Sequence, residues 1–163
     1  MNKLYLLDAY ALIYRAYYAL IQKPRINSKG MNTSAIYGFV NTLEEVKTLF
    51  SPTHLAVAFD PAGKTFRHEI YEPYKAQRQE TPEDIRKSVP GIKAIIRAYN
   101  RRILEVELLE AAEVIGTAAS RCASADTEVD MLTPDKDYGQ LVGQNIWMLR
   151  PMKGGTFEKL GPD

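Results

Sequence analysis

Short apolar runs that end beside acidic residues constrain the fold of this chain more than any other feature. The first run ends at Asp8 and the second at Asp60. The runs cover residues 3–7, 54–59, 102–106 and 128–133. Their length and composition are typical of buried strands.

Segments of helical periodicity lie between these runs. We predict helices over residues 9–21, 34–50, 82–98 and 109–121, a short helix within 134–142, and a strand pair at 145–150 and 155–159. Strands that alternate with helices predict an α/β fold with a mostly parallel central sheet and helices on both faces.

Length and composition place few further limits on the protein. The chain has 163 residues, so we expect residues 1–163 to form a single domain. One cysteine, Cys122, cannot form an internal disulfide, which favours a cytoplasmic location. No apolar run approaches the roughly 18 residues of a membrane span. The net charge of +1 does not by itself predict a nucleic-acid partner.

Acidic residues recur where the predicted strands end or where the next helix begins. They are Asp8, Asp60, Glu110, Glu113, Asp135 and Asp137. The carboxyl ends of parallel strands meet at one edge of a sheet, so we expect these carboxylates to gather there. Oxygen ligands without His or Cys select hard cations such as Mg²⁺ or Mn²⁺, and two such ions can support phosphodiester hydrolysis.

Two other interpretations of these acids stay open at this stage. A single aspartate after a strand is more often a helix cap or a turn residue than a metal ligand. Phosphotransfer through an aspartyl nucleophile would use the same edge of the sheet. That chemistry usually shows a second aspartate two positions after the first, and Tyr10 stands there.

Basic and aromatic residues are interleaved just after Asp60 and on the first predicted helix. They are Phe66, Arg67, Tyr71, Tyr74, Lys75 and Arg78, together with Tyr14, Arg15, Tyr17 and Tyr18. Arg and Lys can hold phosphates, and tyrosines can stack on unpaired bases. For any single one of these residues, a solvated or half-buried structural role is the more frequent interpretation. We interpret Trp147 as a core residue.

Four segments of the chain resemble the N-terminal 5′→3′ exonuclease domain of bacterial DNA polymerase I. They read LYLLDAYALIYRAYYAL, PTHLAVAFDPAGKTFRHEIYEPYKAQR, TPEDIR and TPDKDYGQLV. The resemblance extends over essentially all 163 residues. It implies the PIN-like, resolvase-like fold of the flap endonucleases, with an arch-like segment around residues 64–90.

The resemblance also implies a substrate and roles for named residues. Members of this family hydrolyse DNA with a 5′ flap or a single-stranded 5′ end, using two divalent ions, Mg²⁺ or Mn²⁺. Asp8, Asp60 and Glu110 match positions of the first metal site, and Asp135 and Asp137 match the second. The positions that handle the 5′ phosphate region are matched by Arg15, Arg67, Tyr74, Lys75 and Arg78.

Two departures from the family pattern predict weak or lost activity. The family usually reads GYEADDVIG where this chain reads LLEAAEVIG, so Ala112 replaces a ligand aspartate and Glu113 replaces the next. Glu113 is longer and lies on a different helix face, so it does not substitute directly. The family's C-terminal helix–hairpin–helix segment is also missing, which predicts a missing C-terminal region or a partner subunit that supplies it. A non-catalytic nucleic-acid-binding module and, less favoured, a PIN-type ribonuclease stay open as alternatives.

Overall fold

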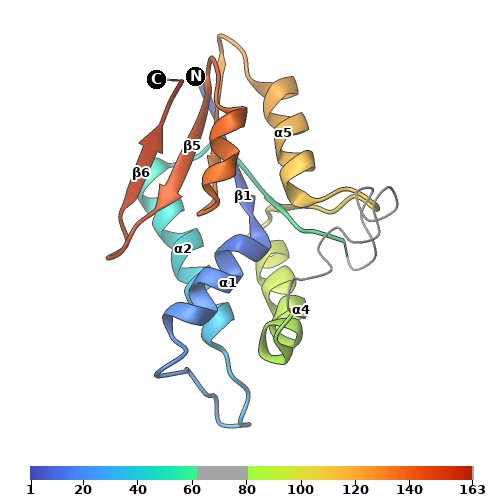
Figure 1. The fold of residues 1–163 in the computed structure, drawn as a ribbon, viewed down its shortest axis with the longest axis vertical. Coiled ribbons are helices and arrows are strands. Elements are labelled where there is room, and N and C mark those ends of the chain that lie inside the picture. The colour runs from blue at the N-terminus through green and yellow to red at the C-terminus, as the bar shows by residue number, and fades with distance from the viewer. Residues whose placement is uncertain (62–80, 163) are drawn as a thin grey trace.

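A six-stranded sheet forms the centre of the protein in the computed structural model, which describes residues 1–61 and 81–162 (Figure 1). The strands are β1 (Asn2–Asp8), β2 (His54–Ala58), β3 (Arg102–Leu104), β4 (Thr127–Leu132), β5 (Ile146–Pro151) and β6 (Phe157–Leu160). Their order across the sheet is β3-β2-β1-β4-β5-β6. All neighbours pair in parallel except β5 and β6, which are antiparallel.

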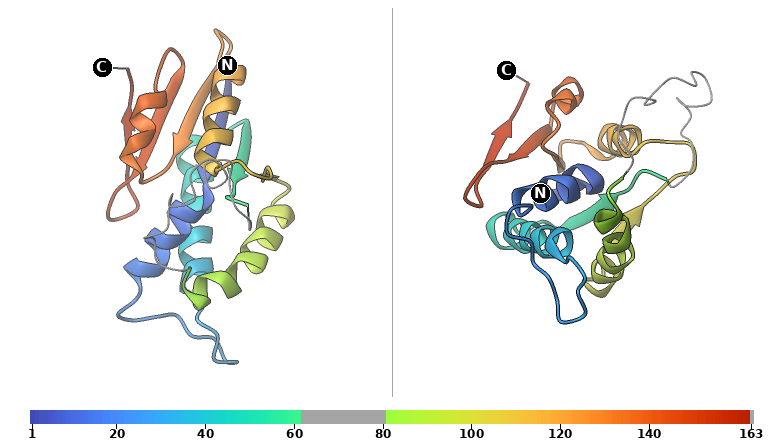
Figure 2. Two further views of the ribbon diagram at one scale, coloured as in Figure 1. Left: turned by 45° about the vertical axis from the view of Figure 1, so that its right-hand side comes forward. Right: turned by 60° about the horizontal axis from the view of Figure 1, so that its bottom comes forward.

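Helices cover both faces of the sheet, as the sequence predicts (Figures 1 and 2). They are α1 (Ala9–Ala19), α2 (Ser34–Phe50), α4 (Glu83–Ala98), α5 (Ala111–Cys122) and the 3-10 helix η1 (Lys136–Leu141). The first three pack on one face, over alternate strand residues such as Tyr5, Leu7 and Val57. The other face carries α5 and Tyr138 of η1, which pack on Leu6, Ala58 and Met131.

Gly38 lets α1 and α2 approach closely. A Cβ atom at this position would lie 2.4 Å from the Cβ of Ala16 and 3.2 Å from its Cα. Packing densities in protein interiors leave no room for such an overlap. A glycine is therefore needed at this contact, on the face of the sheet that supports β1.

Several predicted boundaries are wrong by a few residues. The third strand ends at Leu104 and not at residue 106, and the following helix begins at Ala111 and not at residue 109. The backbone turns between them, where Leu108 adopts a φ of 72°. In the predicted arch-like segment at residues 64–90, residues 83–90 belong to α4, while residues 64–80 lie outside the described residues. Trp147 is half-buried on β5 and not in the core, and the Lys159 ammonium lies over its ring, 4.8 Å from the centroid.

The strand order places a topological switch point between β1 and β4. From β1 the chain proceeds outward through β2 to β3, and it then returns to add β4 on the other side of β1. The segments that follow β1 and β4 enter opposite faces of the sheet, α1 on one and η1 on the other. A crevice outside the carboxyl ends of these two strands is where ligands bind in sheets of this kind. In the described part of the chain, no helix is long and apolar enough to span a bilayer.

Candidate active site

Asp8 lies at the switch point, where β1 ends and α1 begins. It is 7% exposed, and the Thr133 hydroxyl donates a hydrogen bond to its Oδ2 atom at 3.0 Å. Burial raises the pKa of this carboxyl to about 6. The Thr133 hydrogen bond opposes that shift and the negative charge of Asp60 adds to it. The fold therefore holds the Asp8 carboxyl in a fixed position, where burial makes its ionised form less favourable than in water.

Thr133 joins Asp8 to the acids that follow β4. Its hydroxyl is fully buried and also accepts a hydrogen bond from the Asp135 backbone N–H at 3.1 Å. The Asp135 Oδ1 atom in turn accepts from the Asp137 backbone N–H at 2.9 Å. A continuous chain of hydrogen bonds thus connects Asp8 with the exposed residues Asp135 and Asp137.

Asp60 connects the end of β2 to the start of α5. Its Oδ1 atom accepts a hydrogen bond from the Ala111 backbone N–H at 2.7 Å. Glu110 is the N-cap residue of α5, and Glu113 lies in the first turn of that helix. Negative side chains are favourable here because the helix N-terminus carries a partial positive charge.

The capping interpretation of these acids is therefore confirmed at two positions. Asp60 caps α5 from a distant strand, and Asp135 caps η1. Asp8 is the N-cap residue of α1, and the Ala11 backbone N–H in the first turn of that helix lowers the pKa of its carboxyl against the effect of burial. The Tyr138 hydroxyl is buried beside the Asp8 carboxylate and interacts with it. Its burial and the charge of Asp8 raise the pKa of this hydroxyl far above its ordinary value.

All six predicted acids lie where strands end or helices begin at the carboxyl edge of the sheet, and we call this set the acidic rim. The acids lie at the predicted edge of the sheet, but the described residues do not bring them together as the predicted metal sites require. Within residues 1–61 and 81–162, no group of three or more His, Cys, Asp or Glu side chains is close enough to hold one metal ion. The side-chain oxygens suit Mg²⁺ or Mn²⁺ in kind, but the described residues do not assemble a complete ligand set.

Ala112 is the position at which the sequence predicts a missing metal ligand. It lies in the first turn of α5 between Ala111 and Glu113, is half-buried, and packs against the core on the α5 side of the sheet. The resemblance predicts a carboxylate at this position, and the chain has a methyl group there. Methyl groups contribute no ligand to a cation.

The predicted DNA-binding residues are only partly placed by the structure. Arg67, Tyr74, Lys75 and Arg78 lie outside the described residues, as do Phe66 and Tyr71. Arg15 is half-buried in the middle of α1. On the same helix, the Tyr17 hydroxyl donates to the Asp84 Oδ2 atom at 3.0 Å, which links α1 to α4. Tyr17 therefore has a structural role, while Tyr18 remains 47% exposed.

Sequence reasoning missed two members of the site, Thr133 and Tyr138. A weak signal for Thr133 exists, because a hydroxyl residue directly follows β4 and precedes Asp135 by two positions. Nothing in the local pattern indicates that its partner is Asp8. Tyr138 resembles an ordinary amphipathic helix residue.

Fold and site together define an α/β domain with an acidic rim at its topological switch point. Over residues 3–161, the sequence matches the family described as 5′-3′ exonuclease, N-terminal resolvase-like domain. The chain belongs to this family.

Curated relatives of the chain are longer than the chain itself. DNA polymerase I of Bacillus caldotenax is 38% identical over 156 residues, which are 95% of this chain and 17% of that protein. A 5′-3′ exonuclease of Aquifex aeolicus is 37% identical over 159 residues, which are 98% of this chain and 54% of that protein. The chain thus spans about half of one relative and about a sixth of the other.

Solved structures agree on the fold. The T5 D15 protein, co-crystallised with metal ions, superposes with a TM-score of 0.73 over 98% of this chain and 58% of that one, at 14% identity. The catalytic core of Rad2 in complex with DNA gives a TM-score of 0.58 over 98% of this chain and 48% of that one, at 16% identity. The predicted fold class is confirmed by these neighbours.

Proposed function

We propose that this domain acts on DNA with a 5′ flap or a single-stranded 5′ end, as a divalent-metal-dependent 5′-nuclease domain whose cleavage activity is weak or lost. The observation that carries the proposal is the hydrogen-bonded connection from Asp8 through Thr133 to Asp135 at the switch point. It holds carboxylates from two strands that are adjacent in the sheet but distant in sequence.

Family membership supports the DNA substrate and the class of reaction. Its relatives are named as DNA polymerase I and 5′-3′ exonuclease. One structural neighbour is described as a flap endonuclease in a pseudo-enzyme-product complex with DNA and metal ions. We extend the substrate class from these proteins to this chain. Mg²⁺ or Mn²⁺ is the proposed ion, because the rim offers carboxylate oxygens without His or Cys.

Reduced activity is supported by the chemistry of the rim. Ala112 offers no oxygen, and the described residues form no cluster of three carboxylates. An ion held by fewer charged ligands binds more weakly and is displaced more readily by water. What the chain retains is the positioning of Asp8, Asp60 and Asp135, and the capping bonds that fix the last two.

Restoring the missing carboxylate tests the proposal. We expect Ala112→Asp to bind Mn²⁺ at least about tenfold more tightly than the parent chain in calorimetry. We also expect it to cleave a fluorescent 5′-flap DNA faster in the presence of Mn²⁺. Thr117→Asp is the matched control, because it adds the same charge on an exposed position of α5.

The results separate the possible functions. Unchanged Mn²⁺ binding in Ala112→Asp would contradict the metal-site assignment. Improved binding without cleavage, together with retained binding of flap DNA in anisotropy measurements, would favour the non-catalytic nucleic-acid-binding module. That alternative is favoured by the incomplete ligand set within the described residues.

A further inference from the structure

A pocket of about 550 Å³ lies at the amino ends of the strands, on the edge of the sheet opposite the acidic rim. The pocket is lined by the first residues of four strands, Asn2, His54, Arg102 and Thr127, and by Cys122 at the end of α5. Cavities of about 300–1,000 Å³ accommodate small organic ligands. The pocket is thus distinct from the site proposed for DNA cleavage.

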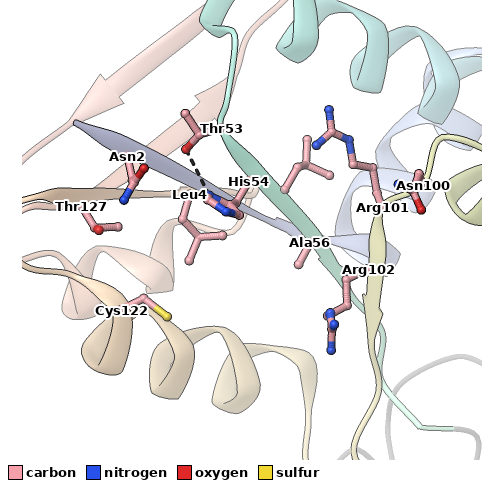
Figure 3. Close-up of a pocket in the computed structure, with 11 residues that line it drawn as sticks. Asn2, Leu4, Thr53, His54, Ala56, Asn100, Arg101, Arg102, Cys122 and Thr127 are labelled. Carbon is pink, nitrogen blue, oxygen red and sulfur yellow. Dashed lines mark hydrogen bonds between the residues drawn. The ribbon is translucent and has the colours of Figure 1, made fainter.

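Strand register places the lining side chains on one face. Leu4 pairs with His54, and Ala56 pairs with Arg102. Paired residues of parallel neighbours point to the same side of a sheet, and Leu4 and Ala56 pack with the α5-side core. Figure 3 shows the Arg102 guanidinium on the same side as the Cys122 sulfur, whereas the Arg101 guanidinium points to the other side.

The charge of the lining favours an anion. Arg102 and His54 are the basic side chains on this face, Arg101 lines the pocket with its guanidinium pointing to the other side, and the lining contains no Asp or Glu. Within residues 1–61 and 81–162, Arg102 forms no ion pair, although Lys93, Arg86 and Lys159 each do. The C-terminus of α5 carries partial negative charge near the pocket, and Arg121 in its last turn offsets that charge.

Polar and apolar groups are ordered along the pocket. Asn2 and Thr127 lie at one end, Leu4 and Ala56 form the middle, and Arg102 lies at the other end (Figure 3). An amide and a hydroxyl can bind the edge of a base, aliphatic side chains can contact its flat face, and a guanidinium matches a phosphate in geometry and charge.

We propose that this pocket binds a mononucleotide, with its phosphate on Arg102 and its base over Leu4 toward Asn2. The assignment follows from the order of the lining groups and from the volume of the pocket. The pocket shares no residue with the acidic rim, so the assignment does not rest on the function proposed for that site.

Cys122 reports on occupancy, because it is the chain's single cysteine and it lines the pocket. We expect adenosine monophosphate to slow the reaction of Cys122 with a thiol reagent in the full chain. We expect Arg102→Gln to weaken this protection by at least about tenfold in nucleotide concentration, as expected for loss of a charge-assisted phosphate contact. Arg101→Gln is the matched control, because its side chain points away, and it should keep the protection.

Three outcomes would overturn the proposal. The first is no protection by adenosine monophosphate at millimolar concentration. In the second, inorganic phosphate protects as strongly as the nucleotide, which would reduce the pocket to a simple anion site. In the third, the Arg101→Gln and Arg102→Gln chains lose protection equally while both keep the parent's circular dichroism spectrum. Adenosine without phosphate should protect much less than the monophosphate.

Discussion

Asp130 is a buried acid in the middle of β4, and its replacement by asparagine should stabilise the protein at neutral and alkaline pH. The side chain has an exposed fraction of 0%, and both carboxylate oxygens are out of contact with solvent. The Lys159 ammonium lies 3.4 Å from Asp130 Oδ1 and 2.7 Å from Glu128 Oε2. Burial, and then a proton shared with Glu128, raise the pKa of Asp130 to about 7.

The magnitude follows from this shift. One pKa unit corresponds to about 1.4 kcal/mol, so a change from 3.8 to about 7 corresponds to about 4 kcal/mol for an isolated group. The attraction to Lys159, whose side chain is 38% exposed, is already contained in this net shift, because it lowers the pKa of Asp130 against the effect of burial. The interaction with Glu128 reduces the gain, because part of the shift belongs to the pair of acids and not to Asp130 alone. We therefore expect Asp130→Asn to raise the free energy of unfolding by about 2–3 kcal/mol at pH 8.

The pH dependence gives the sign of the effect. Between about pH 4 and pH 7 the folded chain keeps the Asp130 proton that the unfolded chain releases. In the parent chain, the contribution of Asp130 to the free energy of unfolding therefore falls as pH rises from about 4 to 7, and it no longer changes above pH 7. Asparagine mimics the protonated acid at every pH, so the variant lacks this component.

Urea denaturation at pH 5 and pH 8 measures the free energy of unfolding of both chains, and so gives the gain at pH 8 and its dependence on pH. Thermal melting at pH 8 should show a gain of roughly 4–12 °C for the variant. Asp126→Asn is the matched control, because it removes an exposed acid from the turn before β4. Other acids with raised pKa values, such as Asp8, affect the parent and the variant alike. A variant that is less stable than the parent at pH 8, or a parent-minus-variant difference that does not change with pH, would refute the reasoning.

Two further substitutions test the support of the site. Thr133→Val removes the hydrogen bond to Asp8 and should lower the free energy of unfolding by about 1–3 kcal/mol in urea, whereas Thr133→Ser should keep most of it; equal effects of the two would show that the hydroxyl is unimportant. Gly38→Ala places a methyl group 2.4 Å from the Ala16 Cβ and should destabilise by about 1–3 kcal/mol. Gly91→Ala, whose nearest new contact is 3.4 Å, should be neutral or stabilising by up to about 1 kcal/mol, and a loss as large as that of Gly38→Ala would contradict the packing argument.

Local pattern in the sequence determines much of this fold. Apolar runs and helical periodicity give the order of the elements and the α/β class, because burial of one helix face and of whole parallel strands leaves a periodic record. Acidic residues at strand ends predict that one edge of the sheet carries the site. Boundaries are less well determined: the prediction extends β3 past Leu104, because nothing in the sequence marks the turn at Leu108.

Tertiary structure alone decided which partners the site residues have. Thr133 bonds to Asp8 across 125 positions, and Asp60 bonds to the Ala111 backbone N–H across 51. The same applies to Asp130, whose sequence context suggests an ordinary polar position in a strand, although the fold buries it completely under Lys159. Periodicity reports which side of its own element a residue faces, and hydrogen bonding and burial depend on which distant element the fold brings opposite to it.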